Sequence, residues 1–218
     1  MTAPLCIALP KGRVHEEAVA LFARAGLDVS ASLAPDRRLL HDCGPLRVLV
    51  VKPSDVPTYV EYGAADLGVA GKDVLEEEAR DLYEPLDLGI GACRMAVAEP
   101  VGRPVDERGQ LHLRVATKYP NVTRAWLARR GLFAEVIRLQ GSIELAPLTG
   151  LADRIVDLVS SGETLRQNGL REVETLFPVT SRLVVHRPSM KLRGDEIGAI
   201  VTRLRAALAP GRRPARAR

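Results

Sequence analysis

The sequence has few of the features that mark disulfide-rich, metal-binding or membrane proteins. Its three cysteines, Cys6, Cys43 and Cys93, are an odd number, lie far apart and form no C-x-x-C motif. The four histidines lack metal-ligand spacing, and no apolar run approaches the roughly 20 residues that span a bilayer. No basic and then apolar signal segment opens the chain. These absences predict a reduced, soluble, cytoplasmic protein with no membrane segment.

Histidine and cysteine also offer no constellation for nucleophilic catalysis. The segment "HEEA" at His15 begins like a zinc-protease motif but lacks the second histidine. We therefore predict that His15 is a surface residue at the start of a helix, and the sequence identifies no metal ligands.

Positive charge is in excess only near the C-terminus. The chain has 31 Lys and Arg residues against 27 Asp and Glu residues, a net charge of +4. The final "APGRRPARAR" holds four arginines and no acid, so removing it leaves 27 basic against 27 acidic residues. A nucleic-acid-binding domain usually carries its excess charge on a folded face. We therefore predict no nucleic-acid partner and a disordered, solubilising tail.

Short apolar segments alternate with segments of helical periodicity. Strands are expected over 5–9, 46–51, 66–70, 86–98, 113–117, 136–139 and 155–159, and an extended segment, interrupted near Pro178, over 173–185. Helices are expected over 15–25, 53–62, 72–79, 121–130 and 197–208. This alternation predicts an α/β protein with parallel sheets. At 218 residues, 46% of them hydrophobic, the chain can bury a core without disulfides.

Two segments indicate similar halves. "ADLGVAGKDVL" and "ADRIVDLVSSGETL" each run from Ala-Asp through an apolar strand and a glycine turn into a helix. Any two strand–helix units share this pattern, so the similarity is a weak indication. It nevertheless suggests two lobes around a cleft, with ligands at the carboxyl ends of the strands.

The turn inside "DLVSSGETLRQNGL" is a candidate phosphate site. Ser160, Ser161 and Gly162 join an apolar strand to a segment expected to be helical from Glu163. Amides at a helix start lack internal partners and the helix dipole is positive there, while Ser161 and Thr164 add hydroxyl donors. Asp157, within the strand, would accept hydrogen bonds from ribose hydroxyls or help to hold a metal. The alternative is an ordinary capped helix, since Ser-Ser-Gly-Glu-Thr is good N-cap sequence.

Cations follow three other expected strands. "LPKGR" places Lys11, Gly12 and Arg13 at a helix start, where two cations beside free amides suit a polyphosphate. Lys52 and Lys72 also lie at strand ends. Solvated basic residues on turns are the alternative. With the phosphate turn, the pattern predicts a site for two phosphorylated substrates.

Several motifs together resemble those of ATP phosphoribosyltransferase, the committed enzyme of histidine biosynthesis. They are "ALPKGR", "SDVPTYVEYGAADLGVAGKDVLEE", "GACR", "ATKYPNV" and "GSIELAPLTGLADRIVDLVSSGETLRQNGL", in order from about residue 5 to about residue 183. The resemblance implies transfer of the phosphoribosyl group to adenine N1 of ATP, with release of pyrophosphate and with Mg²⁺ as cofactor. It also implies a two-lobed fold like that of type II periplasmic binding proteins, with a central cleft. Lobe one would cover 1–93 plus 180–218, and lobe two 94–179.

The resemblance also implies roles for single residues. Phosphoribosyl pyrophosphate would be bound by residues of the turn and of two acidic positions: Ser160, Ser161, Gly162, Glu163, Thr164, Leu165, Asp157 and Glu144. ATP would be bound by Lys11, Gly12, Arg13, Lys72 and Asp73, with a helix N-cap as the alternative role of Asp73. The catalytic cations would be Lys11, Arg13 and Lys52. The family usually has arginine at position 52, and lysine offers a point charge in place of a bidentate fork.

The length of the chain resembles the short form of the family. That form works with a separate regulatory subunit resembling histidyl-tRNA synthetase, which implies a hetero-oligomer containing a homodimer of this chain. The chemistry needs no general base, because adenine N1 already carries a lone pair. Two alternatives remain, a single-lobed phosphoribosyltransferase and a non-enzymatic receptor-type binding domain. The first would have paired acids before its turn, where Asp157 stands alone, and the second would carry an export signal.

Overall fold

The structure is a computed structural model that describes residues 3–35, 37–106 and 112–209. Contacts between α-carbons divide the chain into two compact units. Unit one comprises Met1–Gly71, Arg80–Gly91 and Thr180–Arg218, and unit two comprises Lys72–Ala79 and Ala92–Val179. Within the described ranges, none of the helices has the length and apolar character needed to cross a membrane. The predicted disordered tail lies outside the described residues, except for Ala209.

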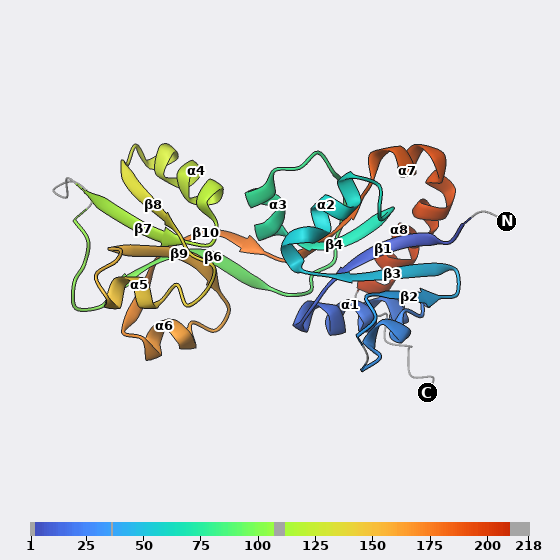
Figure 1. Cartoon of the computed structure of the whole chain (residues 1–218), viewed down its shortest axis with the longest axis horizontal. Coiled ribbons are helices and arrows are strands. Elements are labelled where there is room, and N and C mark those ends of the chain that lie inside the picture. Colours follow the sequence, from blue (N-terminus) through green and yellow to red (C-terminus); the bar gives the residue numbers. More distant parts are fainter. Residues whose placement is uncertain (1–2, 36, 107–111, 210–218) are drawn as a thin grey trace, which may run out of the picture. The chain divides into compact units, whose positions relative to one another are not determined.

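Unit one is built on a mixed six-stranded sheet in the order β2-β3-β1-β4-β11-β5 (Figure 1). Its strands are β1 (Leu5–Pro10), β2 (Leu40–Cys43), β3 (Leu46–Val51), β4 (Leu67–Gly71), β5 (Tyr83–Asp87) and β11 (Ser181–Val185). Its helices are α1 (Arg13–Arg24), α2 (Val56–Glu61), α7 (Arg187–Leu192) and α8 (Gly194–Leu208), with short 3₁₀ turns η1 (Ser30–Leu33) and η2 (Pro53–Asp55). Strand β1 pairs in parallel with β3 and β4.

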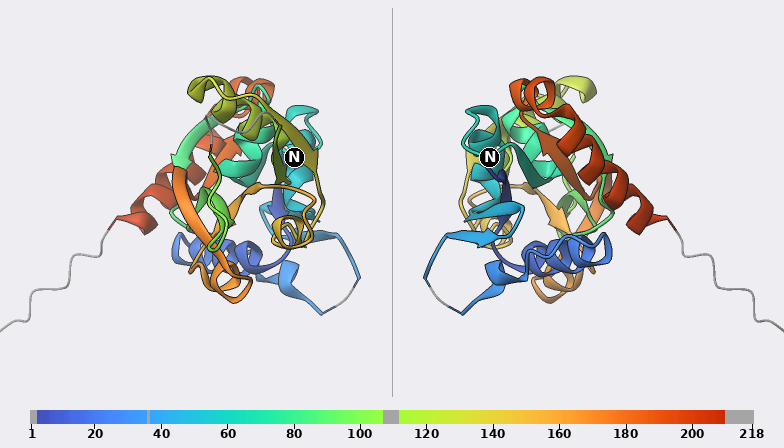
Figure 2. Two further views of the ribbon diagram at one scale, coloured as in Figure 1. Left: turned by 90° about the vertical axis from the view of Figure 1, so that its left-hand side faces the viewer. Right: turned by 90° about the vertical axis from the view of Figure 1, so that its right-hand side faces the viewer.

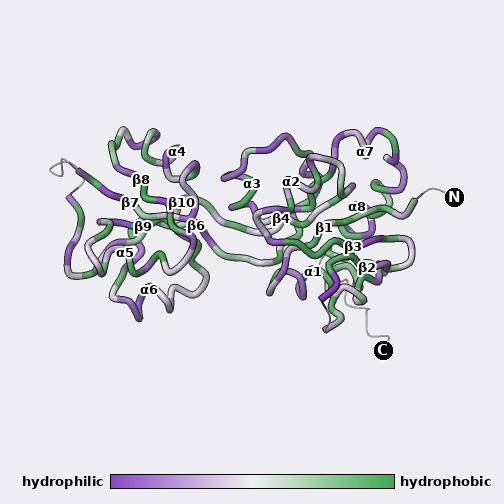
Figure 3. Tube along the Cα trace, viewed as in Figure 1, coloured by the Kyte–Doolittle hydropathy of each residue, from purple (hydrophilic) through white to green (hydrophobic). Residues whose placement is uncertain are grey.

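The core of unit one lies between its sheet and two helices. Helices α1 and α8 contact each other along one face of the sheet (Figure 2, right). Strands β1 and β3 are largely hydrophobic along their length (Figure 3), and Ile7, Val48, Phe22 and Leu204 are fully buried. Burial of both strand faces is the pattern expected of parallel strands covered by helices.

His15 contradicts the prediction of a surface position. Its side chain in the first turn of α1 is only 7% exposed, because η1 packs over that turn. Its Nε2 lies 2.8 Å from Ser32 Oγ, and the Ser32 hydroxyl donates to the Val29 carbonyl at 2.7 Å. Nε2 of His15 is therefore the donor in the first bond. The sequence pattern missed this because η1 has no apolar periodicity.

Unit two contains a five-stranded sheet in the order β10-β6-β9-β7-β8. The strands are β6 (Cys93–Pro100), β7 (Leu113–Thr117), β8 (Ala134–Arg138), β9 (Arg154–Val159) and β10 (Leu170–Val179). The helices are α3 (Lys72–Glu78), α4 (Pro120–Arg130), α5 (Leu145–Leu148) and α6 (Glu163–Gln167). Strand β7 is parallel to β8 and β9, whereas β6 runs antiparallel to β9 and β10. Trp126 of α4 is buried against this sheet.

Most expected elements are present, but two of the boundaries were wrong. The single strand expected over 86–98 is divided into β5 and β6, because Gly89 and Gly91 between them adopt positive φ angles of 63° and 65°. The extended segment 173–185 is interrupted as predicted, but at Thr180, and Pro178 stays within β10. The pattern also missed β2 and the short helices α5 and α7, which span only four to six residues.

Helix α3 follows β4 of unit one directly but packs with unit two. The Tyr119 hydroxyl donates to Asp73 Oδ2 at 2.8 Å, and both side chains are buried. Glu77 accepts hydrogen bonds from the free amides of Asn121 and Val122 in the first turn of α4. Contacts of α3 with α4 thus place 72–79 in unit two, where the family resemblance implied lobe one. The predicted lobe boundaries at 93/94 and 179/180 stay predictions.

We expect Gly68→Ala to destabilise the protein. A methyl group added at Gly68, in β4, would lie 2.7 Å from Val60 Cγ2 and 2.8 Å from Val56 Cγ1 of α2. Valine side chains are short and rigid, so overpacking should lower the free energy of unfolding by about 1–3 kcal/mol. Urea unfolding followed by circular dichroism measures this change.

The matched control is Gly198→Ala in α8, where an added methyl group meets no atom within 4 Å. Alanine is favoured over glycine in a helix by about 1 kcal/mol, so this variant should be slightly more stable than wild type. Equal stability of the two variants would contradict the packing assigned to Gly68.

Candidate functional site

Parallel pairing brings three predicted lysines to one edge of the unit-one sheet. Strands β1, β3 and β4 run in the same direction, and Lys11, Lys52 and Lys72 are the residues that directly follow them. The Lys11 amide donates to the Val51 carbonyl at 2.8 Å, so the turns after β1 and β3 are adjacent. The carboxyl edge of a parallel sheet is where ligands of α/β proteins bind.

These basic residues differ in whether an acidic side chain forms an ion pair with them. Lys11 and Lys52 are exposed and form no ion pair within the described residues. Arg13 lies in the first turn of α1, with its Nε 3.3 Å from Glu17 Oε1. Lys72 is half-buried, and its Nζ lies 3.0 Å from Glu76 Oε1. Gly12 precedes α1 with a φ of 92°, a conformation that favours glycine and lets the chain turn sharply into the helix.

A second group of predicted residues lies at one edge of the unit-two sheet. Because β7, β8 and β9 are parallel, the segments that follow them share this edge. They begin with Lys118, Leu139 and Ser160, and the Leu139 amide donates to the Thr117 carbonyl at 2.9 Å. The structure thus brings the Ser160–Leu165 turn, Asp157 and Glu144 to the same edge of unit two.

The turn after β9 presents unpaired backbone amides. Gly162 has a φ of 75°, in the left-handed region, and within the described residues the amides of Ser161, Gly162 and Thr164 have no hydrogen-bond acceptor. The Glu163 amide is the exception, since it donates to Ser161 Oγ at 3.3 Å. Successive free amides around a left-handed residue form an anion-binding concavity. Because α6 has only five residues, its dipole contributes little, and the free amides are the main feature.

Other side chains fix this turn without pointing at a ligand. Leu165 is only 7% exposed and anchors α6 in the apolar cluster of unit two. Glu163 is exposed and pairs with Arg166, its Oε2 lying 2.6 Å from NH2 of that residue. Ser160 is exposed at the end of β9, and its carbonyl accepts a hydrogen bond from Arg94.

Asp157 has an unusual charge environment. Its pKa is raised from 3.8 to about 6, chiefly by burial and also by the nearby carboxylates of Glu144 and Asp73, while the Leu158 amide and Lys118 act in the opposite direction. The Leu158 amide donates to Asp157 Oδ1 at 2.8 Å. Glu144, the residue before α5, is close enough to act on Asp157 electrostatically. Carboxylates with strongly raised pKa values cluster at functional sites.

Asp73 is more constrained than the sequence indicated. Its side chain is 7% exposed, and its Oδ2 accepts the hydrogen bond from Tyr119. Burial raises the pKa of Tyr119, and the Asp73 carboxylate raises it further, so the phenol stays protonated and remains a donor. Within the described residues, Tyr119 is the hydrogen-bond donor recorded for this carboxylate, at Oδ2.

Sequence reasoning missed two residues of these edges. Lys118 acts on Asp157, and Arg94 contacts the turn after β9. Both lie in segments singled out above, "ATKYPNV" and "GACR", but no spacing rule linked them to the turn. Within the described part of the chain, no three His, Cys, Asp or Glu residues are grouped closely enough to hold a metal by themselves.

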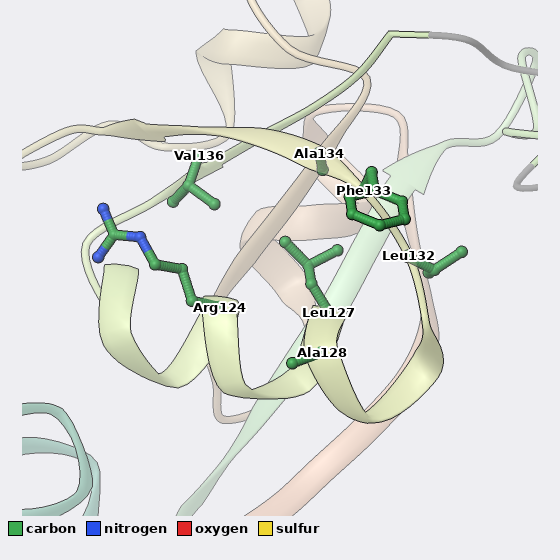
Figure 4. Close-up of a pocket in the computed structure, with 7 residues that line it drawn as sticks. All are labelled: Arg124, Leu127, Ala128, Leu132, Phe133, Ala134 and Val136. Carbon is green, nitrogen blue, oxygen red and sulfur yellow. The ribbon is translucent and has the colours of Figure 1, made fainter.

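A separate cavity of about 350 Å³ lies between α4 and β8 (Figure 4). It is lined by Arg124, Leu127, Ala128, Leu132, Phe133, Ala134 and Val136. None of the predicted site residues contributes to it. The cavity is therefore unrelated to the two edges that carry the cations and the free amides.

Comparison with known proteins gives one consistent family. The family model for ATP phosphoribosyltransferase (HisG) matches residues 52–206. "ATP phosphoribosyltransferase 2" of Geobacter sulfurreducens is 53% identical over 205 residues, which are 92% of this chain and 97% of that one. The ATP phosphoribosyltransferase of Acidithiobacillus ferrooxidans is 53% identical over 215 residues, 96% of this chain and 100% of that one.

Solved structures agree with the sequence relatives. A chain of the "ATP phosphoribosyl transferase (HisG:HisZ) complex from Thermotoga maritima" superposes with a TM-score of 0.82 at 33% identity, covering 93% of this chain and 98% of that one. The periplasmic aliphatic sulphonate binding protein SsuA of Escherichia coli shares the fold, with a TM-score of 0.59 at 15% identity over 95% of this chain and 73% of that one. The fold predicted from the resemblance, of the type II periplasmic-binding-protein kind, is confirmed.

Asp157 should make stability depend on pH. Because its pKa is raised to about 6, the folded state holds its proton more tightly than the unfolded state between about pH 4 and pH 6. Its contribution to the free energy of unfolding therefore falls as pH rises through that window. Asp157→Asn removes this titration, so the variant should gain on the order of 2 kcal/mol relative to wild type from pH 4 to pH 7.

Urea unfolding of both proteins across this pH range tests the expectation. Glu135→Gln is the matched control, since it removes an exposed carboxylate on strand β8. Parallel stability curves for wild type and Asp157→Asn would show that Asp157 titrates normally.

Proposed function

This chain belongs to the ATP phosphoribosyltransferase family, and from that premise we propose which of its residues hold each substrate. The enzyme joins adenine N1 of ATP to C1 of phosphoribosyl pyrophosphate and releases pyrophosphate, the first step of histidine biosynthesis. Both substrates carry several negative charges. The free amides after β9 and the cations after β1 and β3 are complementary to those charges.

The turn after β9 binds the 5′-phosphate of phosphoribosyl pyrophosphate in this proposal. The single observation that carries it is the set of free amides at Ser161, Gly162 and Thr164. Each hydrogen bond to a charged acceptor contributes about 1.5–3 kcal/mol, so three of them can anchor a phosphate without a lysine. The Ser161 and Thr164 hydroxyls add donors, and buried Leu165 holds the turn in place.

Asp157 and Glu144 face the ribose in the same proposal. A carboxylate accepts hydrogen bonds from two neighbouring hydroxyls, and both side chains lie at the edge that carries the turn. The raised pKa of Asp157 belongs to the protein without substrate. Hydrogen bonds from ribose hydroxyls stabilise the charged form, so binding of this substrate should favour the ionised carboxylate.

The cations of the other edge act on the remaining phosphates. Lys11, Arg13 and Lys52 would stabilise the departing pyrophosphate and, with Gly12 and Lys72, the phosphates of ATP. A contact of Asp73 with ATP would be made by a carboxylate that Tyr119 already holds in position through Oδ2. Lysine at position 52 supplies charge without bidentate geometry, so its contribution is electrostatic.

The reaction asks little covalent chemistry of the protein. As the bond from C1 to pyrophosphate breaks, positive charge develops on the sugar and negative charge on the leaving group. Adenine N1 attacks C1 with its own lone pair, so no side chain has to remove a proton first. Rate enhancement then comes from holding N1 behind C1 and from cations aimed at the departing oxygens.

Mg²⁺ fits this arrangement as a companion of the substrate phosphates. Magnesium usually keeps several waters and binds through one or two carboxylates together with phosphate oxygens. Asp157, with Glu144 nearby, is the carboxylate of the described residues best placed for that role. When bound, the metal would neutralise charge on the pyrophosphate.

The assembly is proposed by analogy with the ATP phosphoribosyl transferase (HisG:HisZ) complex from Thermotoga maritima. We expect this chain to be of the short form, to form a homodimer and to join a regulatory subunit resembling histidyl-tRNA synthetase. Histidine inhibition would then act through that partner. A cytoplasmic location, without membrane or nucleic-acid partners, fits a consumer of ATP whose charges balance outside the C-terminal tail.

The reaction itself is tested with purified components. The chain is incubated with ATP, phosphoribosyl pyrophosphate and Mg²⁺, with and without the regulatory subunit from the same source, and pyrophosphate release is measured. We expect release that requires both substrates. If the complete mixture of folded components released no pyrophosphate, the proposed function would be wrong. Activity of the chain alone would show that it does not depend on the partner.

Gly162→Asp should abolish binding of phosphoribosyl pyrophosphate without unfolding the protein. The new Cβ would meet Arg166 NH1 at 3.4 Å and Val159 Cγ1 at 3.8 Å, so it fits, while its carboxylate repels the phosphate. We expect calorimetry to show an affinity at least about 100-fold weaker, equivalent to about 2.7 kcal/mol.

Gly169→Asp is the matched control. It makes the same substitution at a positive φ of 65°, in open space at the far end of α6. This variant should carry the same backbone strain and bind the substrate normally. Equal affinities for the two variants would remove the turn after β9 from the phosphate site.

A further inference from the structure

Two arginines contact successive carbonyl groups of the turn after β9. Arg94 NH1 donates to the Ser160 carbonyl at 2.9 Å, and Arg166 NH1 donates to the Ser161 carbonyl at 3.2 Å. Both side chains line a cavity of about 360 Å³ that also borders Gly162. We propose that Arg94, held by Glu172, is a positioning residue that aims the Ser161 amide at the 5′-phosphate.

The planarity of the peptide bond links the carbonyl to the amide. In a trans peptide the C=O and the N–H point in opposite directions. The Ser160 carbonyl and the Ser161 amide belong to one peptide unit, so a carbonyl drawn toward Arg94 turns that amide to the other side. Arg166 does the same for the next unit, which carries the Gly162 amide. These two amides have no acceptor within the described residues.

Arg94 is held firmly enough to impose this orientation. Its Nε lies 3.0 and 2.9 Å from the two carboxylate oxygens of Glu172, and its NH2 lies 2.6 Å from Oε2. The Thr175 hydroxyl fixes Glu172 in turn, donating to Oε1 at 2.6 Å. This side-on pair engages Nε and NH2, and NH1 is the nitrogen that donates to the Ser160 carbonyl.

The strand register explains why Arg94 reaches the turn. Arg94 lies near the start of β6 and is paired with Val159, the last residue of β9. On its other side β6 pairs with β10, which supplies Glu172. Register pairs Arg94 with Pro178 on that side and Glu172 with Ala98, so the long Arg94 side chain reaches along the sheet to Glu172 while its NH1 contacts the turn.

The ion pairs of Arg94 and Arg166 differ in their exposure to solvent. The Arg94 and Glu172 side chains are 36% and 23% exposed, whereas those of Arg166 and Glu163 are 63% and 55% exposed. Exposed pairs contribute little because water screens them and long side chains lose entropy. Arg94 is therefore the principal positioning residue. Its charge is compensated by Glu172, so its effect reaches the phosphate through the peptide and not as a free cation.

This inference rests on the proposed phosphate site, which is tested first. Backbone amide signals of the isotopically labelled full chain are recorded by NMR while ribose 5-phosphate is added. This probe carries the 5′-phosphate and no pyrophosphate. The NMR signals of the Ser161 and Gly162 amides should shift strongly, toward the chemical shifts of amides that are hydrogen-bonded to a charged group. If they do not respond in the wild-type chain, both the site and the role of Arg94 fail.

Arg94→Met removes the donors while keeping a long side chain. We expect affinity for phosphoribosyl pyrophosphate and for ribose 5-phosphate to fall about 10- to 100-fold, the effect of losing one charge-assisted hydrogen bond. The turnover rate at saturating substrate should change by less than about threefold, since the phosphate does not react. The Ser161 amide signal should also move in the free protein. Arg94→Lys, which keeps a donor but not the fork, should lie between wild type and Arg94→Met.

Arg171→Met is the matched control for charge. Arg171 lines the same cavity, but its NH2 donates to Glu99 and not to the turn. We expect its affinity to stay within about twofold of wild type. Equal losses of affinity in Arg94→Met and Arg171→Met would show a general effect of positive charge and would contradict the proposed positioning role of Arg94. Unchanged affinity in Arg94→Met, with responsive wild-type amides, would overturn it while leaving the phosphate site intact.

Glu172→Gln provides the second variant should Arg94→Met fail to fold. It leaves Arg94 in place but weakens the bidentate pair that directs it. Affinity should fall less than in Arg94→Met. In the double variant with Arg94→Lys and Glu172→Gln, the loss of affinity should be smaller than the sum of the losses in the two single variants. Full additivity of the two would show that Glu172 does not act through Arg94.

Discussion

The parallel pairing of β1 with β3 and β4, and of β7 with β8 and β9, is the constraint on which both groups of site residues depend. Parallel strands end at one edge of a sheet, so residues far apart in sequence are brought together without contacting each other directly. Lys11 and Lys52 are neighbours because Lys11 binds the carbonyl at the end of β3. Lys118 and the turn after β9 lie at one edge of the unit-two sheet because β7 and β9 pair in parallel.

In the proposed function, the two edges would hold anions by different physical means. At the unit-one edge the donors are exposed cations, whose attraction is long-ranged but weakened by water. At the unit-two edge the donors are neutral amides of fixed direction, beside a half-buried carboxylate with a raised pKa. Fixed amides select a phosphate by geometry, and the acids suit hydroxyl groups. Recognition of a sugar phosphate and stabilisation of a leaving pyrophosphate are different tasks, and the two edges match them.

The order of most strands and of the longer helices along the chain could be predicted, because apolar runs and helical spacing are local signals. The break between β5 and β6 could not, since Gly89 and Gly91 sit in an apolar run and only their positive φ angles reveal it. His15 was placed on the surface because η1, which buries it, lacks any periodic pattern. Helix α3 packs with unit two, which local patterns did not indicate, because its Asp73 and Glu77 bind residues more than forty positions away.

The sequence by itself determined the family and the reaction, because ordered motifs with small residues and cations reflect that chemistry directly, and it predicted the residues that the proposed function places near the phosphates. Tertiary structure decided which amides of the turn stay free, how Asp157 titrates and what the arginine of "GACR" does. Those properties depend on burial and on partners such as Glu172, which lies 78 residues from Arg94. Contacts between residues that far apart are made when β6 and β10 pair and long side chains reach across the sheet, which happens only in the folded protein.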